Sequence, residues 1–332
     1  MSVKEKSVIL VADNGFWKQR ELVEQEVLNQ NFELVFALDM KSVKEVSERV
    51  VALVLMDQLC NVDVMDRFPA LRVVARTGTG YDNVDVAEAK RRGIVVTRVS
   101  KVNAEPASDF ALTLLLALSR NLMQLHNKMV IGVWERVPGS VLSEMTIGVV
   151  GLGSIGSSLV KKLHALGTKR IVGWNRSRKP EIFGFVNKYG LELLELPELV
   201  SESDAVMVAV ALAPETAKLL DRKMLSLMKP SAYLVNVSRG AVVDEDALAE
   251  SVTEGKIAGV GLDVFSVEPP DADPFSQPFM KKLIEASKQG KNVILSPHNA
   301  HFTQNSSKNV SLQLALNIKA LLASKTEGIE VV

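Results

Sequence analysis

The sequence predicts an α/β protein with two doubly wound parallel-sheet domains. Short β-branched runs alternate with amphipathic, helix-like stretches, a pattern typical of parallel sheets covered on both faces. The alternation is interrupted once and restarts at residue 146 with TIGVVGLGSIG. A length of 332 residues also suits two domains of ordinary size.

The first hundred residues contain five apolar runs that we expect to be strands: Val8–Asp13, Phe32–Ala37, Ala52–Met56, Arg72–Thr77 and Ile94–Thr97. Helices are predicted between them at Lys18–Asn29, Val43–Val51 and Val86–Arg92. This block contains no glycine-rich phosphate motif.

A long helix is predicted from about Ala104 to Leu122, and a second series of strands follows it. We expect six strands in this series: Ile147–Val150, Arg170–Trp174, Ala205–Ala209, Ala232–Val237, Gly259–Val264 and Val293–Ser296. That number is enough for a second doubly wound sheet. A last helix over Gln304–Ser324 would return to the first domain. The expected domains are therefore residues 1–103 plus 300–332, and residues 104–299.

Composition excludes several classes of protein. Lys+Arg and Asp+Glu number 39 each, so zero net charge gives no global reason to expect nucleic acid or an anionic membrane as partner. The single cysteine, Cys60, cannot form an intrachain disulfide or a cysteine-rich zinc site, and we expect no metal. The N-terminus does not resemble a signal peptide, and the densest apolar run, Phe110–Leu118, is too short to span a bilayer. We expect a cytoplasmic location and no membrane partner.

The GLGSIG motif that begins at Gly151 lies between an apolar strand and a helix-like stretch. Gly151 would permit a tight turn, Gly153 would let the backbone approach a pyrophosphate, and Gly156 would allow close helix–strand packing. Ser154 and Ile155 would open a helix whose free N–H groups face the anion. The alternative is an ordinary strand-to-helix turn without a ligand.

The residues after the next strand predict the choice of dinucleotide. NAD enzymes tend to place an acid there to bind the ribose 2′-hydroxyl. Here Asn175 takes that position, and Arg176, Ser177 and Arg178 follow it. An arginine can bind a 2′-phosphate that a carboxylate would repel. We therefore expect NADP(H), with NAD(H) as the alternative if the arginines only form a solvated turn.

Three downstream segments each follow a predicted strand: NVSRGAVVDEDAL with Arg239, GLDVFSVEPP with Glu268, and LSPHNAH with His298. Ligands of doubly wound sheets bind beyond the carboxyl ends of the strands, so the three side chains could meet in one site. Taken singly, each of the three residues could instead have a purely structural role. His301, three residues past His298, is a second candidate for the histidine role.

These motifs, with RTGTGYDNVDV from Arg76 to Val86, resemble the D-isomer-specific 2-hydroxyacid dehydrogenase family in order and spacing. The resemblance covers nearly the whole chain. It implies a flavodoxin-like substrate domain, an inserted Rossmann cofactor domain, a nicotinamide cofactor, a small 2-oxoacid or D-2-hydroxyacid substrate, and a homodimer.

The resemblance also implies roles that agree with the chemistry of the side chains. Arg239 would hold the carboxylate of a 2-oxoacid and polarise its carbonyl, a task suited to a planar guanidinium. His298 would give a proton to the carbonyl oxygen, since histidine exchanges protons near neutral pH. Glu268 would orient the imidazole and favour its charged form. The backbone N–H groups of Thr79 and Gly80 would bind the substrate carboxylate.

Further residues are assigned by the resemblance alone. Ser238, Asp263 and Ala211 would lie against the cofactor, although Ala211 stands where the family frequently has proline. Gly78 belongs to the substrate loop, and Arg76 corresponds to an arginine that binds a substrate phosphate in the phosphoglycerate dehydrogenase branch.

Three functions remain open at this point. A glyoxylate or hydroxypyruvate reductase is favoured, because the arginine-rich cofactor loop resembles NADPH-using members and the chain ends at Val332 without room for a serine-binding module. Phosphoglycerate dehydrogenase is the alternative. A dinucleotide-sensing corepressor or scaffold on the same fold is the second alternative.

Overall fold

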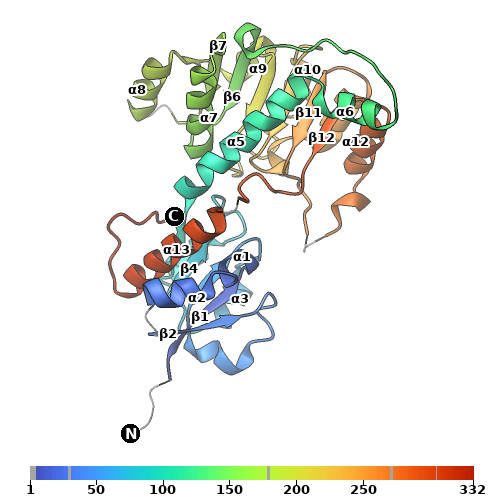
Figure 1. Ribbon diagram of the computed structural model, residues 1–332. Coiled ribbons are helices and arrows are strands. Elements are labelled where there is room, and N and C mark those ends of the chain that lie inside the picture. The colour runs from blue at the N-terminus through green and yellow to red at the C-terminus, as the bar shows by residue number, and fades with distance from the viewer. Residues whose placement is uncertain (1–4, 29–30, 178–179, 270–271, 304) are drawn as a thin grey trace. The chain divides into compact units, whose positions relative to one another are not determined.

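The computed structural model describes residues 5–28, 31–177, 180–269, 272–303 and 305–332 (Figure 1). The chain divides into two compact units. Unit 1 comprises Met1–Asn103 and Phe302–Val332, and unit 2 comprises Ala104–His301. The chain thus returns to unit 1 at residue 302, where we expected residue 300.

Unit 1 is built around five parallel strands in the order β2-β1-β3-β4-β5. The strands are β1 (Ser7–Ala12), β2 (Phe32–Phe36), β3 (Val50–Leu55), β4 (Val73–Arg76) and β5 (Val95–Arg98). The helical segments are α1 (Asn14–Trp17), α2 (Arg20–Val23), the π-helix η1 (Glu24–Leu28), the 3-10 helix η2 (Lys44–Arg49), α3 (Val62–Asp66), α4 (Val86–Arg91) and α13 (Ser306–Leu322).

Two predicted helices of unit 1 are wrong in part. The described part of the predicted stretch Lys18–Asn29, which leaves out Asn29, is not one regular helix, because α2 passes into η1 within it. The stretch Val43–Val51 ends as a helix at Arg49, and its last two residues open β3. Val50 is fully buried there, and a β-branched side chain packs well on a pleated sheet.

The two faces of the unit 1 sheet carry separate apolar cores, because successive side chains of a strand point to opposite faces. In β1, Val8 and Leu10 belong to one core, and Ile9 and Val11 belong to the other. Helix α13 covers the second face with a fully buried Leu314. The C-terminal segment is thereby part of unit 1.

Unit 2 is built around seven parallel strands in the order β12-β11-β10-β9-β6-β7-β8. The strands are β6 (Thr146–Val150), β7 (Arg170–Trp174), β8 (Glu192–Leu193), β9 (Ala205–Val208), β10 (Tyr233–Asn236), β11 (Gly259–Leu262) and β12 (Asn292–Leu295). All six predicted strands are present. The seventh, β8, is too short to leave a pattern in the sequence.

The helical segments that surround this sheet are α5 (Ser100–Ser119), α6 (Leu122–Val130), η3 (Leu142–Glu144), α7 (Ser154–Ala165), α8 (Pro180–Tyr189), α9 (Leu196–Glu202), α10 (Arg222–Ser226), η4 (Gly240–Val242), α11 (Glu245–Thr253), η5 (Pro274–Ser276) and α12 (Pro278–Lys288). Helices α5 and α7 pack on one face, and α9, α11 and α12 pack on the other. The predicted long helix stops at Ser119, and Asn121 next to it has a left-handed backbone with φ of 53°.

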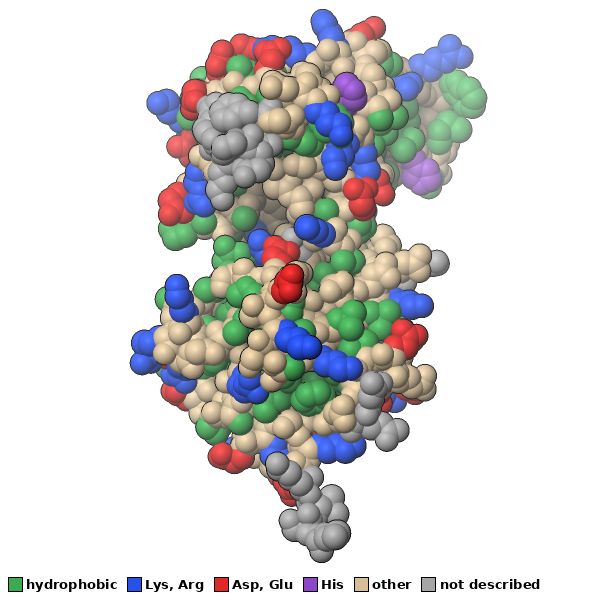
Figure 2. Space-filling view, turned by 90° about the vertical axis from the view of Figure 1, so that its left-hand side faces the viewer, with side chains coloured by type: hydrophobic (Ala, Val, Ile, Leu, Met, Phe, Trp, Pro, Cys, Tyr) green, Lys and Arg blue, Asp and Glu red, His purple; other side chains and the backbone are tan. Residues whose placement is uncertain are grey.

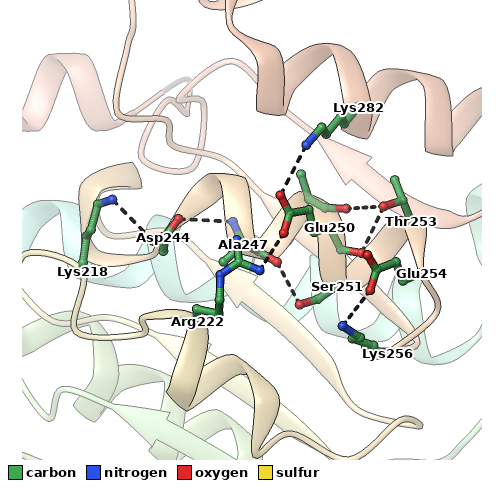
Figure 3. Close-up of polar contacts among 11 residues, drawn as sticks. Lys218, Arg222, Asp244, Ala247, Glu250, Ser251, Thr253, Glu254, Lys256 and Lys282 are labelled. Atoms are coloured by element: carbon green, nitrogen blue, oxygen red, sulfur yellow. Dashed lines mark hydrogen bonds and ion pairs between the residues drawn. The ribbon is translucent and has the colours of Figure 1, made fainter.

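Ion pairs on the outer side of α11 join it to neighbouring segments (Figure 3). Glu250 lies 2.6 Å from Arg222 of α10 and 3.5 Å from Lys282 of α12. Asp244, the N-cap of α11, lies 3.4 Å from Lys218. Exposed pairs of this kind are screened by solvent and contribute little to the stability of a fold.

The described charged side chains do not form a patch of one sign on the displayed face (Figure 2). Acidic and basic side chains are interspersed on the face displayed in Figure 2, in keeping with the zero net charge. In the described ranges, no helix combines the length and the apolar character needed to cross a membrane.

Exposed apolar side chains lie on α6 and on the extended segment after it. We call residues 122–141 the apolar arm, whose path Figure 1 shows. Val130, Ile131 and Trp134 are 71%, 75% and 79% exposed.

Candidate active site

The carboxyl ends of the unit 2 strands lie at one edge of the sheet, because all of its strands are parallel. Every described site residue predicted in unit 2 belongs to a loop or helix start that follows one of these strands. The order of the strands reverses between β6 and β9. Such a switch point is where doubly wound sheets bind ligands.

The glycine-rich turn has the geometry that a bound pyrophosphate needs. Gly151 has a φ of +98°, and a Cβ on it would lie 2.7 Å from the Cα of Val210. A Cβ on Gly156 would lie 1.9 Å from the carbonyl oxygen of Gly151. Gly153 differs, because no atom lies within 4 Å of a Cβ built there. Two glycines are therefore required by the fold, and the third leaves open space.

Helix α7 presents its N-terminus next to that space. Its N-cap is Gly153, which makes no side-chain capping bond, and its first turn contains no acidic residue. Ser154 begins the helix, and Ile155 packs against the unit 2 core. Free N–H groups and the positive end of the helix dipole both favour an anion. These residues fit a dinucleotide pyrophosphate.

The loop after β7 supports the glycine-rich turn. Asn175 accepts a hydrogen bond from Leu152 N at 3.1 Å and donates one to the Ser177 carbonyl at 2.7 Å. Arg176 pairs with Glu215 at 3.0 Å, and their side chains are 62% and 65% exposed. An exposed pair is weak, so Arg176 could exchange Glu215 for another anion. Arg178 lies outside the described residues.

The loop after β9 is closed by a threonine. Thr216 Oγ1 donates a hydrogen bond to the Ala211 carbonyl at 2.7 Å and accepts one from Ala213 N at 2.7 Å. Ala211 itself is exposed. The buried Thr216 thus orders this loop although the frequent proline is missing.

Asn236, at the end of β10, shapes the turn that carries Arg239. Its Oδ1 accepts hydrogen bonds from Ser238 N and Oγ at 3.0 and 2.9 Å, and its Nδ2 donates to the Arg239 carbonyl at 2.9 Å. A Cβ on Gly240 would lie 2.1 Å from the carbonyl carbon of Phe265, so the turn packs directly on the loop after β11. Arg239 and the Glu268 loop are therefore positioned together.

Glu268 and His298 are joined by a short polar contact. His298 Nδ1 lies 2.7 Å from Glu268 Oε2, and Glu268 Oε1 accepts a hydrogen bond from Phe265 N at 2.8 Å. The two side chains are 27% and 25% exposed. His298 has a φ of 52°, a left-handed conformation that is held by its N–H donating to the Asp263 carbonyl at 2.7 Å.

The carboxyl of Glu268 is kept ionised by its neighbours. Burial alone would raise its pKa, but the hydrogen bond and charge of His298, the Phe265 N–H and the charge of Arg239 together lower the pKa below 4.5. The effect of Arg239 on this carboxylate joins all three predicted catalytic residues electrostatically. A carboxylate, an imidazole and a guanidinium thus act on one another at the sheet edge.

Asp263 holds the backbone of the His298 segment. Its fully buried carboxylate accepts hydrogen bonds from Ser296 Oγ at 2.6 Å, Asn299 N at 2.8 Å and Ala300 N at 2.8 Å. Burial raises the pKa of Asp263, and these hydrogen bonds offset the effect only in part. Its structural role was not predicted from the sequence.

A second buried carboxylate supports the Glu268 loop and was also not predicted. Glu245, the first residue of α11, accepts hydrogen bonds from Ser266 N at 2.9 Å and from Ser266 Oγ. Burial raises its pKa, and the nearby charge of Glu268 adds to the shift. Asn236 and Glu245 both lie within the NVSRGAVVDEDAL segment, but its pattern alone does not indicate these contacts.

The predicted substrate loop lies in unit 1, after β4. Arg76 is 2% exposed and donates to the carbonyls of Gly80 at 3.0 Å and Leu55 at 3.4 Å. Thr77 donates through its hydroxyl to Asp13 at 2.9 Å. Gly78, Thr79 and Gly80 follow and are partly exposed. Arg76 is therefore directed at backbone carbonyls of its own unit.

Two other sequence candidates can be placed. Cys60 is buried, and burial raises the pKa of its thiol to about 12, so it remains protonated at neutral pH. His301 packs edge-on against His298 with ring centroids 5.7 Å apart. The 2.7 Å contact of His298 Nδ1 with Glu268 favours His298 for the catalytic role.

Comparison with known proteins identifies the family. Residues 112–300 match the profile described as the NAD binding domain of D-isomer specific 2-hydroxyacid dehydrogenases. The chain is also 36% identical over 319 residues to a glyoxylate reductase of Thermococcus kodakarensis, which covers 93% of this chain and 90% of that one. The chain belongs to the D-isomer-specific 2-hydroxyacid dehydrogenase family. The resemblance seen in the motifs is thereby confirmed.

Other members of this dehydrogenase family show the same fold. The structure of an NADPH-dependent glyoxylate/hydroxypyruvate reductase of Sinorhizobium meliloti, in complex with NADP and malonate, is similar with a TM-score of 0.81 and 30% identity, over 99% of this chain and 97% of that chain. A D-3-phosphoglycerate dehydrogenase of Methanocaldococcus jannaschii is 34% identical over 78% of this chain but only 47% of its own length. The chain is an NAD(P)-dependent oxidoreductase with a flavodoxin-like domain and a Rossmann domain, as predicted.

Proposed function

We propose that this dehydrogenase is an NADPH-dependent reductase of small 2-oxoacids, of the glyoxylate and hydroxypyruvate class, that forms D-2-hydroxyacids. One observation carries the proposal: the 2.7 Å contact between Glu268 and His298, with Arg239 acting on the same carboxylate, at the sheet edge that also holds the glycine-rich turn. The similarity to glyoxylate reductases over most of the chain supports the substrate class.

The residues of the site have separate tasks in this reaction. When bound, the dinucleotide supplies the hydride. Arg239 binds the substrate carboxylate and polarises the carbonyl, for which the guanidinium fork is suited. His298 donates a proton from Nε2 to the carbonyl oxygen, because its Nδ1 faces Glu268. Glu268 keeps the ring oriented and stabilises its positive charge.

We assign the binding of the dinucleotide to the loops of unit 2. The N–H groups at the start of α7 would hold the pyrophosphate, with Gly153 allowing its approach. Ser238 would line the nicotinamide side and Ala211 the adenine side, and the buried Asp263 would hold the backbone beside the nicotinamide through Asn299 N and Ala300 N. The preference for NADPH rests on Arg176 and Arg178 and on Asn175 in place of an acid, because a 2′-phosphate needs cations and repels a carboxylate.

The unit 1 loop would bind the substrate carboxylate through the N–H groups of Thr79 and Gly80. In the part of the chain that the structure describes, neither amide donates to a protein acceptor. Arg76 argues against phosphoglycerate dehydrogenase, because its buried guanidinium is directed at the Gly80 and Leu55 carbonyls and not at solvent. A small unphosphorylated 2-oxoacid is therefore the favoured substrate.

We also assign a homodimer and a cytosolic site of action. The apolar arm exposes Val130, Ile131 and Trp134 by more than two thirds. Exposed apolar patches mark interfaces, and a second copy of this chain is the proposed occupant. Sedimentation of the protein should give a dimer that Trp134→Glu dissociates. The cytosolic assignment rests on the single cysteine, which is free and buried and therefore suits a reducing compartment.

A paired screen tests the function. Both NADPH and NADH are mixed with glyoxylate, hydroxypyruvate, 3-phosphohydroxypyruvate, pyruvate and branched 2-oxoacids, and the loss of reduced-nicotinamide absorbance is followed. We expect the highest kcat/KM with NADPH and glyoxylate or hydroxypyruvate. A preference for 3-phosphohydroxypyruvate would favour phosphoglycerate dehydrogenase, and cofactor binding without turnover of any acid would favour the corepressor or scaffold.

A further inference from the structure

Three carbonyl groups of the Thr77–Gly80 loop each accept a hydrogen bond from a side chain of unit 1. Asn103 Nδ2 donates to the Thr77 carbonyl at 3.0 Å, and Arg76 Nε donates to the Gly80 carbonyl at 3.0 Å. The shortest bond runs from Arg98 Nη1 to the Thr79 carbonyl at 2.7 Å. Two of the three donors are permanently charged guanidinium groups.

Arg98 is itself held in place from several directions. Its Nε lies 2.7 Å from Glu330 Oε1, and its guanidinium lies 5.0 Å from the centre of the Tyr81 ring. The backbone of Glu330 is also tied to this strand, because its carbonyl accepts hydrogen bonds from Thr97 Oγ1 at 2.8 Å and Arg98 N at 3.3 Å. The Arg98 side chain is 24% exposed, so its charge is only partly screened.

The hydrogen bond from Arg98 to the Thr79 carbonyl also affects the Gly80 N–H. The Thr79 carbonyl and the Gly80 N–H belong to one planar trans peptide group, in which C=O and N–H point in opposite directions. A charged donor on the carbonyl therefore fixes the direction of the Gly80 N–H. It also polarises the peptide group and makes this N–H a stronger donor.

We propose that Arg98 is a positioning residue for substrate binding, which orients and strengthens the Gly80 N–H toward the carboxylate of a 2-oxoacid. Glu330, from the C-terminal segment, positions Arg98 in turn. The inference rests on the proposed function, in which Thr79 and Gly80 bind that carboxylate. It concerns the binding of the acid and not the transfer of hydride or proton.

Arg49 provides a matched control in the same unit. It also joins a backbone carbonyl to a carboxylate, with Lys6 O at 2.8 Å and Glu33 Oε2 at 2.7 Å, and its side chain is 25% exposed. The carbonyl that it contacts lies outside the Thr77–Gly80 loop. Arg49→Met thus removes an equivalent structural tie without acting on the Gly80 peptide.

The experiment compares Arg98→Met, Arg98→Lys and Arg49→Met with the unaltered full-length protein. For Arg98→Met we expect KM for glyoxylate, and the Kd of the unreactive acid oxalate in the presence of NADPH, to rise about tenfold, while kcat changes less than about threefold. Arg98→Lys keeps the charge and should give an intermediate KM. Arg49→Met should leave both constants unchanged.

An amide resonance separates this inference from the proposed function. The Gly80 N–H signal in a two-dimensional NMR spectrum should move in Arg98→Met and not in Arg49→Met, whether or not the protein reduces glyoxylate. Absence of turnover by the unaltered protein would overturn the proposed function alone. An unmoved Gly80 signal, or an equal oxalate Kd in the Arg98 and Arg49 variants, would overturn the inference. If Arg98→Met does not fold, the same comparison with Arg98→Lys decides.

Discussion

The imidazole of His298 and the carboxylate of Glu268 are joined by a 2.7 Å contact, although they follow different strands of the unit 2 sheet. The carboxylate is fixed on its other side by the Phe265 N–H at 2.8 Å. Nδ1 of His298 therefore faces a rigid anion, and Nε2 is the ring nitrogen suited to exchange a proton with a bound acid.

His298→Ala should lower kcat for glyoxylate reduction by about 10² to 10⁴, because that is the usual contribution of a general acid. The Kd for NADPH, measured by fluorescence titration, should stay within about twofold of the original value. His301→Ala is the control, since His301 is the other histidine candidate and its ring packs edge-on against that of His298. A larger loss in the His301 variant would transfer the proton-donor role to that residue.

Glu268→Gln should change the pH dependence of the reaction. Reduction needs the imidazolium form of the proton donor, and the neutral amide no longer stabilises that charge. The alkaline limb of the kcat/KM profile should therefore move to lower pH, with reduced activity at pH 8. A profile that keeps its position after the substitution would contradict the ion-pair role.

The substitution Glu268→Gln should also change how the stability of the fold depends on pH. The folded-state pKa of Glu268 lies below its ordinary value of 4.5, so the unfolded chain binds its proton more readily. Its contribution is present above pH 4.5 and is lost as the pH falls through the folded value. Urea unfolding between pH 3 and 7 should show a weaker loss of stability toward acid in Glu268→Gln. An equal loss of unfolding free energy toward acid in both proteins would count against a lowered pKa of Glu268.

Much of the fold is predictable because it depends on local pattern. Buried parallel strands such as β7 are short β-branched runs with turn residues on both sides, and periodicity finds them. The errors occur where tertiary packing outweighs local preference. Val50 joins β3 because it is buried there, and β8 exists only by pairing with β7.

The site is predictable to the extent that its residues form motifs. The glycine-rich turn and the Arg239, Glu268 and His298 segments have a recognisable spacing. Asn236 and Glu245 lie within the Arg239 segment, but its pattern does not indicate their supporting roles. Arg98 lies outside the motifs, and both Arg98 and Glu245 act on another loop, through the Thr79 carbonyl and Ser266 N. Such contacts depend on three-dimensional proximity, which a single sequence does not reveal.

Gly153→Ala should separate cofactor binding from folding. No atom lies within 4 Å of the added Cβ, so stability should fall by about 1 kcal/mol or less, the cost of alanine at an N-cap. The methyl group would occupy the space of the pyrophosphate, and the Kd for NADPH should rise by about tenfold or more.

Gly184→Ala is the matched control for that substitution. Gly184 also has open space around its Cβ position, but it lies in α8. Alanine there should stabilise the helix by roughly 0.5–1 kcal/mol and leave the Kd for NADPH unchanged. Unimpaired NADPH binding by Gly153→Ala would rule out the pyrophosphate site.

Arg176→Ala should weaken NADPH by about tenfold and NADH by less than about twofold, because only NADPH carries the 2′-phosphate. Arg222→Ala is the control, because Arg222 is as exposed as Arg176 and pairs with Glu250 at 2.6 Å, far along the chain from the cofactor loop. Isothermal titration with both dinucleotides measures the difference. Equal weakening of the two cofactors in Arg176→Ala would refute the proposed preference.

Transfer of a deuterium label tests the central claim most directly. NADPH with deuterium on the transferable position of the nicotinamide is incubated with glyoxylate and the protein, and the product is analysed by mass spectrometry. We predict glycolate with one deuterium on the carbinol carbon, formed by the unaltered protein and at least about a hundredfold more slowly by His298→Ala. Bound cofactor that transfers no deuterium to glyoxylate, hydroxypyruvate or any other 2-oxoacid would contradict the account.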